Sequence, residues 1–156
     1  MQRVDTLDEL AILLQTDLSR YDIDSLMAHP GLRLDGAFTQ VVRAIKGGGR
    51  PAAILACRLM MEDPHLPFGK LIKSNLARAL KQQVDLLTEH EKLDLAGKTA
   101  ALLSLPYCPR EVEDYCRLVK KMGGRFADTA VAMSRPIDEK AHSLVAYLGM
   151  PPQKAI

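Results

Sequence analysis

PAAILACRLMMEDP (residues 51–64) is the stretch that decides the fold, because it contains one helix together with its start and its stop. Pro51 suits the first helical position, where its missing N–H would have no partner within the helix anyway. Leu55, Leu59 and neighbouring apolar residues recur at helical spacing, and Pro64 cannot continue the helix. The stretch therefore predicts a short helix that packs against others through one apolar face.

Segments of the same kind follow one another in both directions from this stretch. Thr6 with Glu9, and Thr88 with Glu91, match the capping box, in which the two side chains satisfy free N–H groups at a helix start. Prolines and glycines separate the segments, and no convincing strand or hairpin pattern lies between them. We expect helices that begin near Thr6, Asp35, Pro51, Phe68, Thr88, Pro109, Phe126 and Pro136, and one or two turns at residues 22–28.

The sequence thus predicts an all-helical fold of about eight short helices joined by tight turns. Two arrangements stay open: stacked antiparallel hairpins in an α-solenoid-like (HEAT/armadillo-like) array, and an irregular helical bundle. The segment 126–133 is apolar almost all round, so we expect it at the centre of the packing. We expect one helical domain over residues 1–150, divided into an acidic N-terminal part (1–36) and a main array (37–149), with a flexible tail (151–156).

The composition is that of an ordinary globular protein, since 47% of the 156 residues are apolar and 26% are charged. No apolar run approaches the ~18 residues that a membrane-spanning helix needs. Acidic residues at positions 5, 8 and 9 interrupt the region where a secretory signal would be continuously apolar. Three cysteines without clustered spacing are typical of a reducing compartment, so we expect a cytoplasmic protein that does not bind a membrane.

The net charge of +2 hides an uneven distribution along the chain. Residues 1–36 contain seven acids and three bases, a net charge of −4, whereas residues 37–84 contain eight bases and two acids, a net charge of +6. Residues 85–156 contain ten of each. The middle of the chain is therefore where charge indicates a binding partner.

The expected helix at 68–87 carries the strongest functional signal. No Asp or Glu occurs from Pro64 to Val84, and a helical projection places a row of cations opposite the apolar face. Such a row can bind an acidic protein surface, including the chain's own acidic N-terminal part, or neutralise phosphates of a nucleic acid. It can also be a face that only contacts water. No aromatic residue for base stacking is interleaved, which favours a protein partner over single-stranded nucleic acid. The residues of this row are Lys70, Lys73, Arg78 and Lys81.

Two glycine-rich turns add a second hypothesis. The turns Lys46-Gly-Gly-Gly-Arg50 and Lys121-Met-Gly-Gly-Arg125 both join helices, and glycine-rich backbone beside a helix start can bind an anion. In an alternating stack of helices both turns lie on the same edge. We therefore expect Arg43, with Lys46 and Arg50, to extend the basic row, and Lys121 with Arg125 to form a secondary anion site. The alternative is that glycine simply ends these helices.

Catalytic and cofactor motifs are not recognisable in this sequence. Cys108 precedes Pro109 at an expected helix start, where the helix dipole would favour a thiolate, but a nucleophile also needs a base. The four histidines and three cysteines show no metal-ligand spacing, and no phosphate-binding or dinucleotide fingerprint occurs. We expect no metal and no cofactor.

The sequence therefore favours a non-enzymatic protein that acts by binding a protein partner, as an adaptor, inhibitor or regulatory subunit. The alternative is a nucleic-acid-binding regulator that uses the same basic face, and a less favoured third is an enzyme with a site around Cys108. The oligomeric state stays open.

Overall fold

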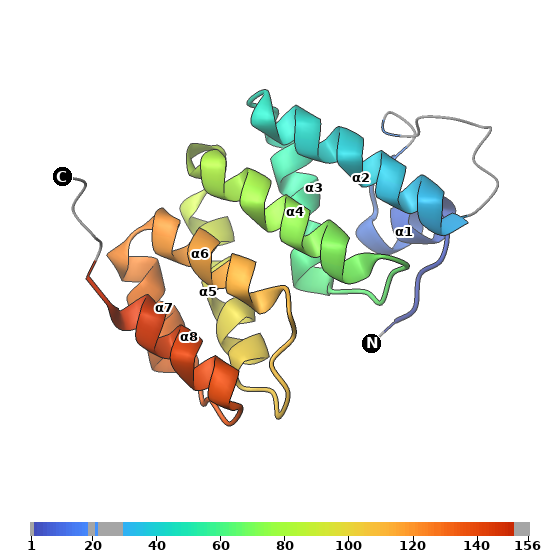
Figure 1. Ribbon diagram of the computed structural model, residues 1–156. Coiled ribbons are helices and arrows are strands. Elements are labelled where there is room, and N and C mark those ends of the chain that lie inside the picture. Colours follow the sequence, from blue (N-terminus) through green and yellow to red (C-terminus); the bar gives the residue numbers. More distant parts are fainter. Residues whose placement is uncertain (1, 19–20, 22–29, 152–156) are drawn as a thin grey trace. The chain divides into compact units, whose positions relative to one another are not determined.

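The computed structural model describes residues 2–18, 21 and 30–151, without the side chains of residues 30–33. The regular structure in these residues is helical, as expected (Figure 1). The chain divides into two compact units, residues 1–87 and 88–156. The turns expected at residues 22–28 and most of the expected tail lie outside the described residues. The single helical domain over residues 1–150 stays a prediction.

The first unit contains four α-helices and one short 3₁₀ helix in its described part. Helix α2 packs beside α4, and α3 contacts α1, α2 and α4. Leu10, Ile45, Leu59, Leu76 and Leu80 are buried in the apolar core that these contacts create. The elements are α1 (Leu7–Leu14), α2 (Pro30–Lys46), α3 (Arg50–Glu62), α4 (Gly69–Gln82) and η2 (Val84–Leu86).

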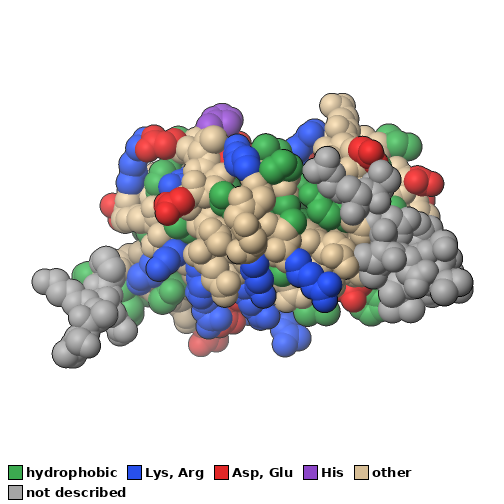
Figure 2. Space-filling view, turned by 90° about the horizontal axis from the view of Figure 1, so that it is seen from above, with side chains coloured by type: hydrophobic (Ala, Val, Ile, Leu, Met, Phe, Trp, Pro, Cys, Tyr) green, Lys and Arg blue, Asp and Glu red, His purple; other side chains and the backbone are tan. Residues whose placement is uncertain are grey.

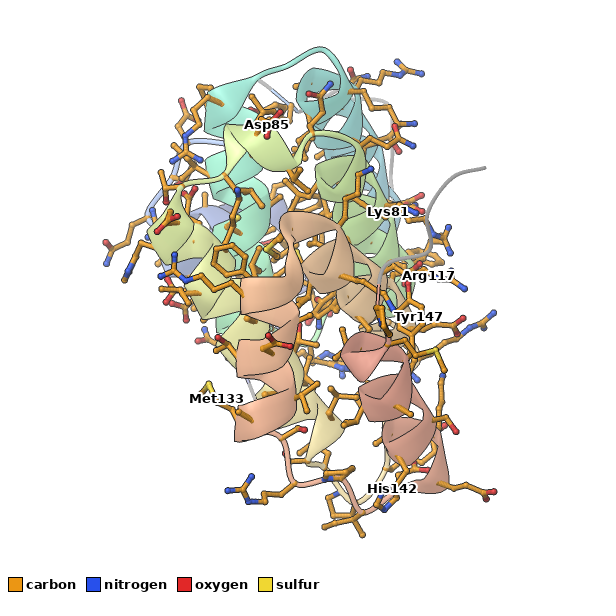
Figure 3. All side chains as sticks on the ribbon, turned by 90° about the vertical axis from the view of Figure 1, so that its left-hand side faces the viewer. Lys81, Asp85, Arg117, Met133, His142 and Tyr147 are labelled. Carbon is orange, nitrogen blue, oxygen red and sulfur yellow. The ribbon has the colours of Figure 1, made fainter. Side chains whose placement is uncertain are left out.

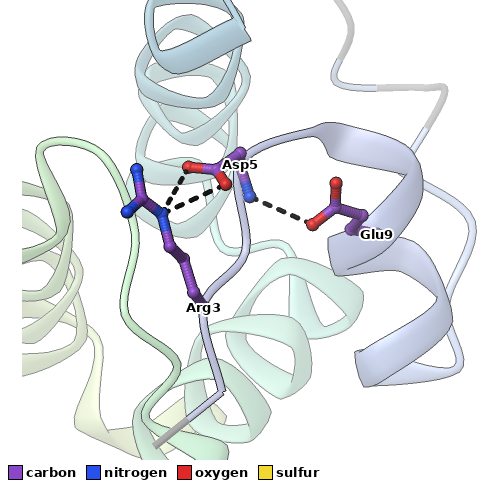
Figure 4. Close-up of polar contacts among 3 residues, drawn as sticks. All are labelled: Arg3, Asp5 and Glu9. Atoms are coloured by element: carbon purple, nitrogen blue, oxygen red, sulfur yellow. Dashed lines mark hydrogen bonds and ion pairs between the residues drawn. The ribbon is translucent and has the colours of Figure 1, made fainter.

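The start of α1 resembles the predicted capping box but differs in one bond (Figure 4). The backbone N–H of Glu9 donates to the hydroxyl oxygen of Thr6 at 3.1 Å, as predicted. The Glu9 carboxylate, however, accepts from the N–H of Asp5 at 3.3 Å, one residue before the cap. The Asp5 carboxylate in turn accepts from Arg3 Nε at 3.2 Å, so the segment before α1 is tied to the helix start.

The loop between α3 and α4 is held from two sides within the first unit. The Asp63 carboxylate lies 2.7 Å from Lys73 Nζ, and both side chains are buried. His65 pairs with the N-terminal segment in a parallel bridge, where Val4 N–H donates to His65 O and His65 N–H donates to Gln2 O, both at 2.9 Å. These contacts fix the start of α4 relative to the end of α3.

The described part of the second unit, residues 88–151, contains four helices that pack on one another as a bundle. The predicted capping box at its start is confirmed: Thr88 N–H donates to the Glu91 carboxylate at 2.8 Å, and Glu91 N–H donates to the Thr88 hydroxyl oxygen at 3.2 Å. Gly97 lies where α5 faces α7, since a Cβ on it would be 3.7 Å from Met133 Cε. The helices are α5 (Glu89–Leu103), α6 (Val112–Met122), α7 (Gly124–Met133) and α8 (Glu139–Gly149).

Several predicted helix starts are wrong because a proline can begin a helix, end one or precede a turn. Helix α2 begins at Pro30 and not near Asp35. Helix α6 begins at Val112, after a turn that follows Pro109. Helix α8 begins after Pro136, where the Asp138 carboxylate caps it by accepting from the N–H of Lys140.

Two further expectations need correction. The helix predicted to run to Leu87 ends at Gln82, and the 3₁₀ helix η2 follows it. Helix α7 is not buried all round: Phe126 and Ala130 are buried, but the Met133 side chain is 57% exposed and points away from the helix (Figure 3). The helix contacts within each unit fit a bundle, and solenoid-like stacking is not confirmed. None of the helices in the described part of the chain is long and apolar enough to cross a membrane.

Candidate functional site

A groove between α2 and α4 is a concave surface of the first unit. Its cavity volume is about 370 Å³. The two helices lie side by side (Figure 1) and contribute five residues each. The lining residues are Asp35, Phe38, Thr39, Val42 and Lys46 from α2, and Ile72, Asn75, Arg78, Ala79 and Gln82 from α4.

The groove has an apolar floor and a polar rim. Phe38, Ile72 and Ala79 are at most 3% exposed, so they form the base of the groove and also belong to the core of the unit. Hydroxyl, amide and charged side chains stand above this floor and are wholly or partly exposed. This combination of an apolar base with a few polar groups is typical of binding sites.

The two helices run in the same direction along the groove. Gln83 Nε2, just after α4, donates to the backbone carbonyl of Lys46 at the end of α2, at 3.0 Å. The C-terminal ends of both helices therefore meet at one end of the groove. Lys46 and Arg43 lie in the last turn of α2 and Lys81 in the last turn of α4, where cations also complement the helix dipoles.

The structure brings two of the predicted binding residues, Lys46 and Arg78, into this one groove. Arg43 and Lys70 are exposed but do not line the groove, and Lys81 is half-buried near the end of α4 (Figure 3). In the space-filling view, lysine, arginine and acidic side chains are all exposed on the face shown (Figure 2).

Lys73 does not belong to an exposed basic row, and this prediction is wrong. Its side chain is buried and forms the ion pair with Asp63, which precedes the acid-free segment in the sequence. A helical projection assigns faces from one helix alone, whereas the loop before α4 folds back over this part of its surface. Lys73 therefore acts within the fold of the first unit.

The glycine N–H groups of the turn after α2 are used within the turn itself. The N–H groups of Gly47, Gly48 and Gly49 donate to the carbonyls of Arg43, Ile45 and Ala44, at 2.8 to 3.0 Å. All three donors thus close the C-terminal end of α2, and Gly48 has a φ of +88° that favours glycine. The glycines therefore end α2, as the alternative reading predicts, and their N–H groups already have partners within the turn.

Arg50 also has a partner in the fold. Its Nη1 atom donates to the Leu86 carbonyl at 2.7 Å, which ties the start of α3 to η2. The predicted extension of the basic row therefore keeps two exposed cations, Arg43 and Lys46.

The second glycine-rich turn lies in the second unit, so the joint basic edge of the two turns stays a prediction. Arg125 Nη1 lies 3.1 Å from the Glu89 carboxylate, and this ion pair reduces its capacity to hold an anion. Lys121 is exposed. Its neighbour Lys120 donates to the Tyr147 carbonyl at 2.6 Å and lies 4.2 Å from the Tyr147 ring centroid (Figure 3).

Cys108 is not placed as a nucleophile would be. It does not cap a helix, because Glu111 stands at the start of α6 and Cys108 lies in the preceding loop. Its thiol is buried, and burial is the main reason why the pKa of Cys108 is raised; nearby Asp138 and Glu111 raise it further, while Lys140 lowers it. The expected activation by a helix dipole is wrong, since the environment disfavours the thiolate.

The carboxylate of Asp138 joins two loops of the second unit. It accepts from the N–H of Cys108 at 2.8 Å and from the N–H of Lys140 at 3.0 Å. These backbone hydrogen bonds lower the pKa of Asp138, because they favour its charged form. The connection before α6 is therefore fixed to the start of α8.

Sequence reasoning missed the α2 side of the groove. Phe38 and Val42 belong to the apolar pattern of this helix, and the pattern of one helix does not show which neighbour its apolar face meets. The polar residues Asp35, Thr39 and Lys46 recur at spacings of four and seven on the same face. A mixed polar and apolar stripe of this kind is the signal that could have indicated a groove beside α2.

Comparisons with known proteins give no family for this chain: no family model, curated protein or solved structure matches it. Within residues 2–18, 21 and 30–151, no group of three or more His, Cys, Asp or Glu side chains is arranged to hold a metal ion. The expectations of no metal and no cofactor stay predictions.

Proposed function

We propose that this protein is a non-enzymatic, cytoplasmic binding protein that holds an acidic segment of another protein in the groove between α2 and α4. The observation that carries the proposal is the groove itself, where an apolar floor is combined with the cations Lys46 and Arg78. An adaptor, an inhibitor or a regulatory subunit would each use such a site. The proposal does not depend on solenoid-like stacking, because a bundle also offers a groove between two helices.

Charge supports a protein partner of acidic character. Residues 64–84 contain no Asp or Glu, and Arg43 and Lys81, which do not line the groove, lie in the last turns of α2 and α4. Complementary charge accelerates association and selects partners more than it raises affinity. The apolar floor is then needed for affinity, which distinguishes this site from a surface that only neutralises phosphates.

The test uses two single charge reversals. Lys46→Glu changes the groove, and Lys70→Glu makes the same charge change on an exposed residue of α4 that does not line it. Immobilised wild-type and variant proteins are exposed to nuclease-treated cytoplasmic extract of the source cells, and bound proteins are quantified by mass spectrometry. We expect that some proteins bind to both wild type and Lys70→Glu but no longer bind to Lys46→Glu.

The result that contradicts the proposal is equal retention of all proteins by Lys46→Glu and wild type. A parallel titration with mixed duplex DNA and structured RNA, at low and physiological salt, tests the alternative. Steeply salt-dependent binding that Lys46→Glu abolishes would replace the protein partner with a nucleic acid.

A further inference from the structure

The groove continues beyond its lining residues along α4. Asn75, Arg78 and Gln82 line it at spacings of three and four, and Leu71 continues the same row by one turn toward the helix start. Leu71 is 51% exposed, and so is Phe68, which immediately precedes the helix. Two large apolar side chains thus lie in solvent at one end of the row that lines the groove.

The two ends of this surface differ in character. Lys46 and Gln82 lie where the C-terminal ends of α2 and α4 meet. Arg43 belongs to the last turn of α2, and Lys81 belongs to the last turn of α4. The other end has Leu71 and Phe68 from the start of α4. The surface is therefore cationic at one end, whereas the other end combines exposed apolar side chains of α4 with the carboxylate of Asp35 on α2.

Its length suits a short helix. The rows from Leu71 to Gln82 on α4 and from Asp35 to Lys46 on α2 each extend over eleven residue steps, about 17 Å at the helical rise of ~1.5 Å per residue. A bound helix that extends along this whole length has about three turns.

The architecture favours a helical occupant over an extended chain. An extended peptide usually binds by adding a strand to a sheet edge. In the described part of the chain, β-type pairing is limited to the single bridge between Arg3 and His65, and neither residue lines the groove. The space between two side-by-side helices instead accepts the side-chain ridge of a third helix.

We propose that the occupant of the groove is an amphipathic helix of about three turns with an acidic polar face. This inference rests on the proposed function and specifies the partner's chemistry. The apolar residues of the occupant lie against Leu71, Phe68 and the half-buried Val42, and its acidic side chains lie toward Lys46 and Arg78.

The probe is a capped, fluorescently labelled 16-residue peptide with Leu at positions 3, 6, 10 and 13 and with Glu and Ala elsewhere. Three comparison peptides isolate its properties: Lys replaces Glu in the first, two central prolines break the helix in the second, and oligoglutamate without Leu is the third. Anisotropy measures affinity, and circular dichroism measures the helix gained on binding. ¹⁵N chemical shifts identify the amides that the probe perturbs.

We expect the Glu/Leu peptide to bind, to gain helix and to perturb amides of α2 and α4. Lys46→Glu and Leu71→Lys should each weaken binding by about tenfold at low salt, which corresponds to about 1.4 kcal/mol. The matched controls are Lys70→Glu and Ile12→Lys, and the second replaces an apolar residue of α1 that is 78% exposed. Neither control should change the affinity by more than about twofold.

Three results overturn the inference. Equal binding of the proline peptide means that the occupant is extended, and equal binding of oligoglutamate means that only its charge is recognised. No binding of any peptide removes the amphipathic helix as occupant. The capture experiment tests the proposed function independently of the peptides. The proposed function is supported if Lys46→Glu no longer captures proteins that wild type captures, and it is contradicted if Lys46→Glu captures the same proteins.

Discussion

Lys73 Nζ and a carboxylate oxygen of Asp63 lie 2.7 Å apart, with both side chains buried, so α4 is joined to the end of α3 by an ion pair that is largely shielded from water. Asp63 has a φ of +50°, a backbone conformation in which Asp and Asn are among the favoured residues. Each charge needs the other, because a buried charge without a partner is strongly unfavourable.

Asp63→Asn should therefore destabilise the first unit by about 3 kcal/mol or more, because it leaves the Lys73 ammonium buried without its counter-charge. Urea denaturation followed by circular dichroism at 222 nm measures the change. Lys73→Met should have a similar effect, and the double variant should be more stable than either single one because no uncompensated charge remains. A double variant whose loss equals the sum of the two single losses would show that the pair is not energetically coupled.

The pKa of Asp138 predicts a pH-dependent stability of the second unit. Backbone hydrogen bonds lower this pKa, so the carboxylate stabilises the fold above the usual aspartate pKa of about 4, and the effect disappears as pH falls through the lowered value. Asp138→Ala should lower Tm at pH 7, and the difference from wild type should shrink as the pH falls toward 2. Asp128→Ala, an exposed carboxylate of α7, is the control. A Tm difference that is constant across this range would contradict the role of the charged form.

The three cysteines should be unreactive while the protein is folded. All are buried, burial raises the pKa of Cys108, and burial together with nearby Cys108 and Glu113 raises the pKa of Cys116 to about 12. A disulfide reagent such as DTNB at pH 7.5 should modify them slowly in buffer and rapidly in concentrated urea. Rapid, selective modification of Cys108 without denaturant would instead revive the hypothesis of an enzyme with a site around this thiol.

Adjacent glycines at the α6–α7 junction should differ sharply on substitution. Gly123 has φ +125° and ψ 163°, a region that is essentially restricted to glycine, so Gly123→Ala should cost about 1–3 kcal/mol of unfolding free energy. Gly124 begins α7, and a Cβ on it would meet no atom within 4 Å. Gly124→Ala should be neutral or stabilise by up to about 1 kcal/mol. Chemical denaturation measures both changes in unfolding free energy. Equal changes for the two substitutions would contradict the positive φ of Gly123.

Local signals in the sequence predicted local structure well. The box of Thr88 and Glu91 forms as expected, because both partners lie within one helical turn and no distant contact is needed. The role of a proline, in contrast, is ambiguous in the sequence. Pro30 can end one segment or begin the next, and only packing decides between the two.

Contacts between helices could not be predicted from the sequence pattern of each helix alone. Lys73 lies near the polar sector of α4 in a helical projection, and its burial depends on Asp63, which reaches it only after the α3–α4 loop has folded. The groove likewise depends on α2 lying beside α4, so that Lys46 and Arg78, 32 residues apart in the sequence, line one surface. No periodicity within one helix contains this information.

The position of the boundary at residues 87 and 88 has a consequence for synthesis on the ribosome. Both helices of the groove, the loop with Asp63 and the segment that pairs with His65 belong to the first 87 residues, so all of them are synthesised before α5. Since domains generally fold as units during translation, the groove can form on the nascent chain. A partner that binds there would then have access to this protein before its synthesis is complete.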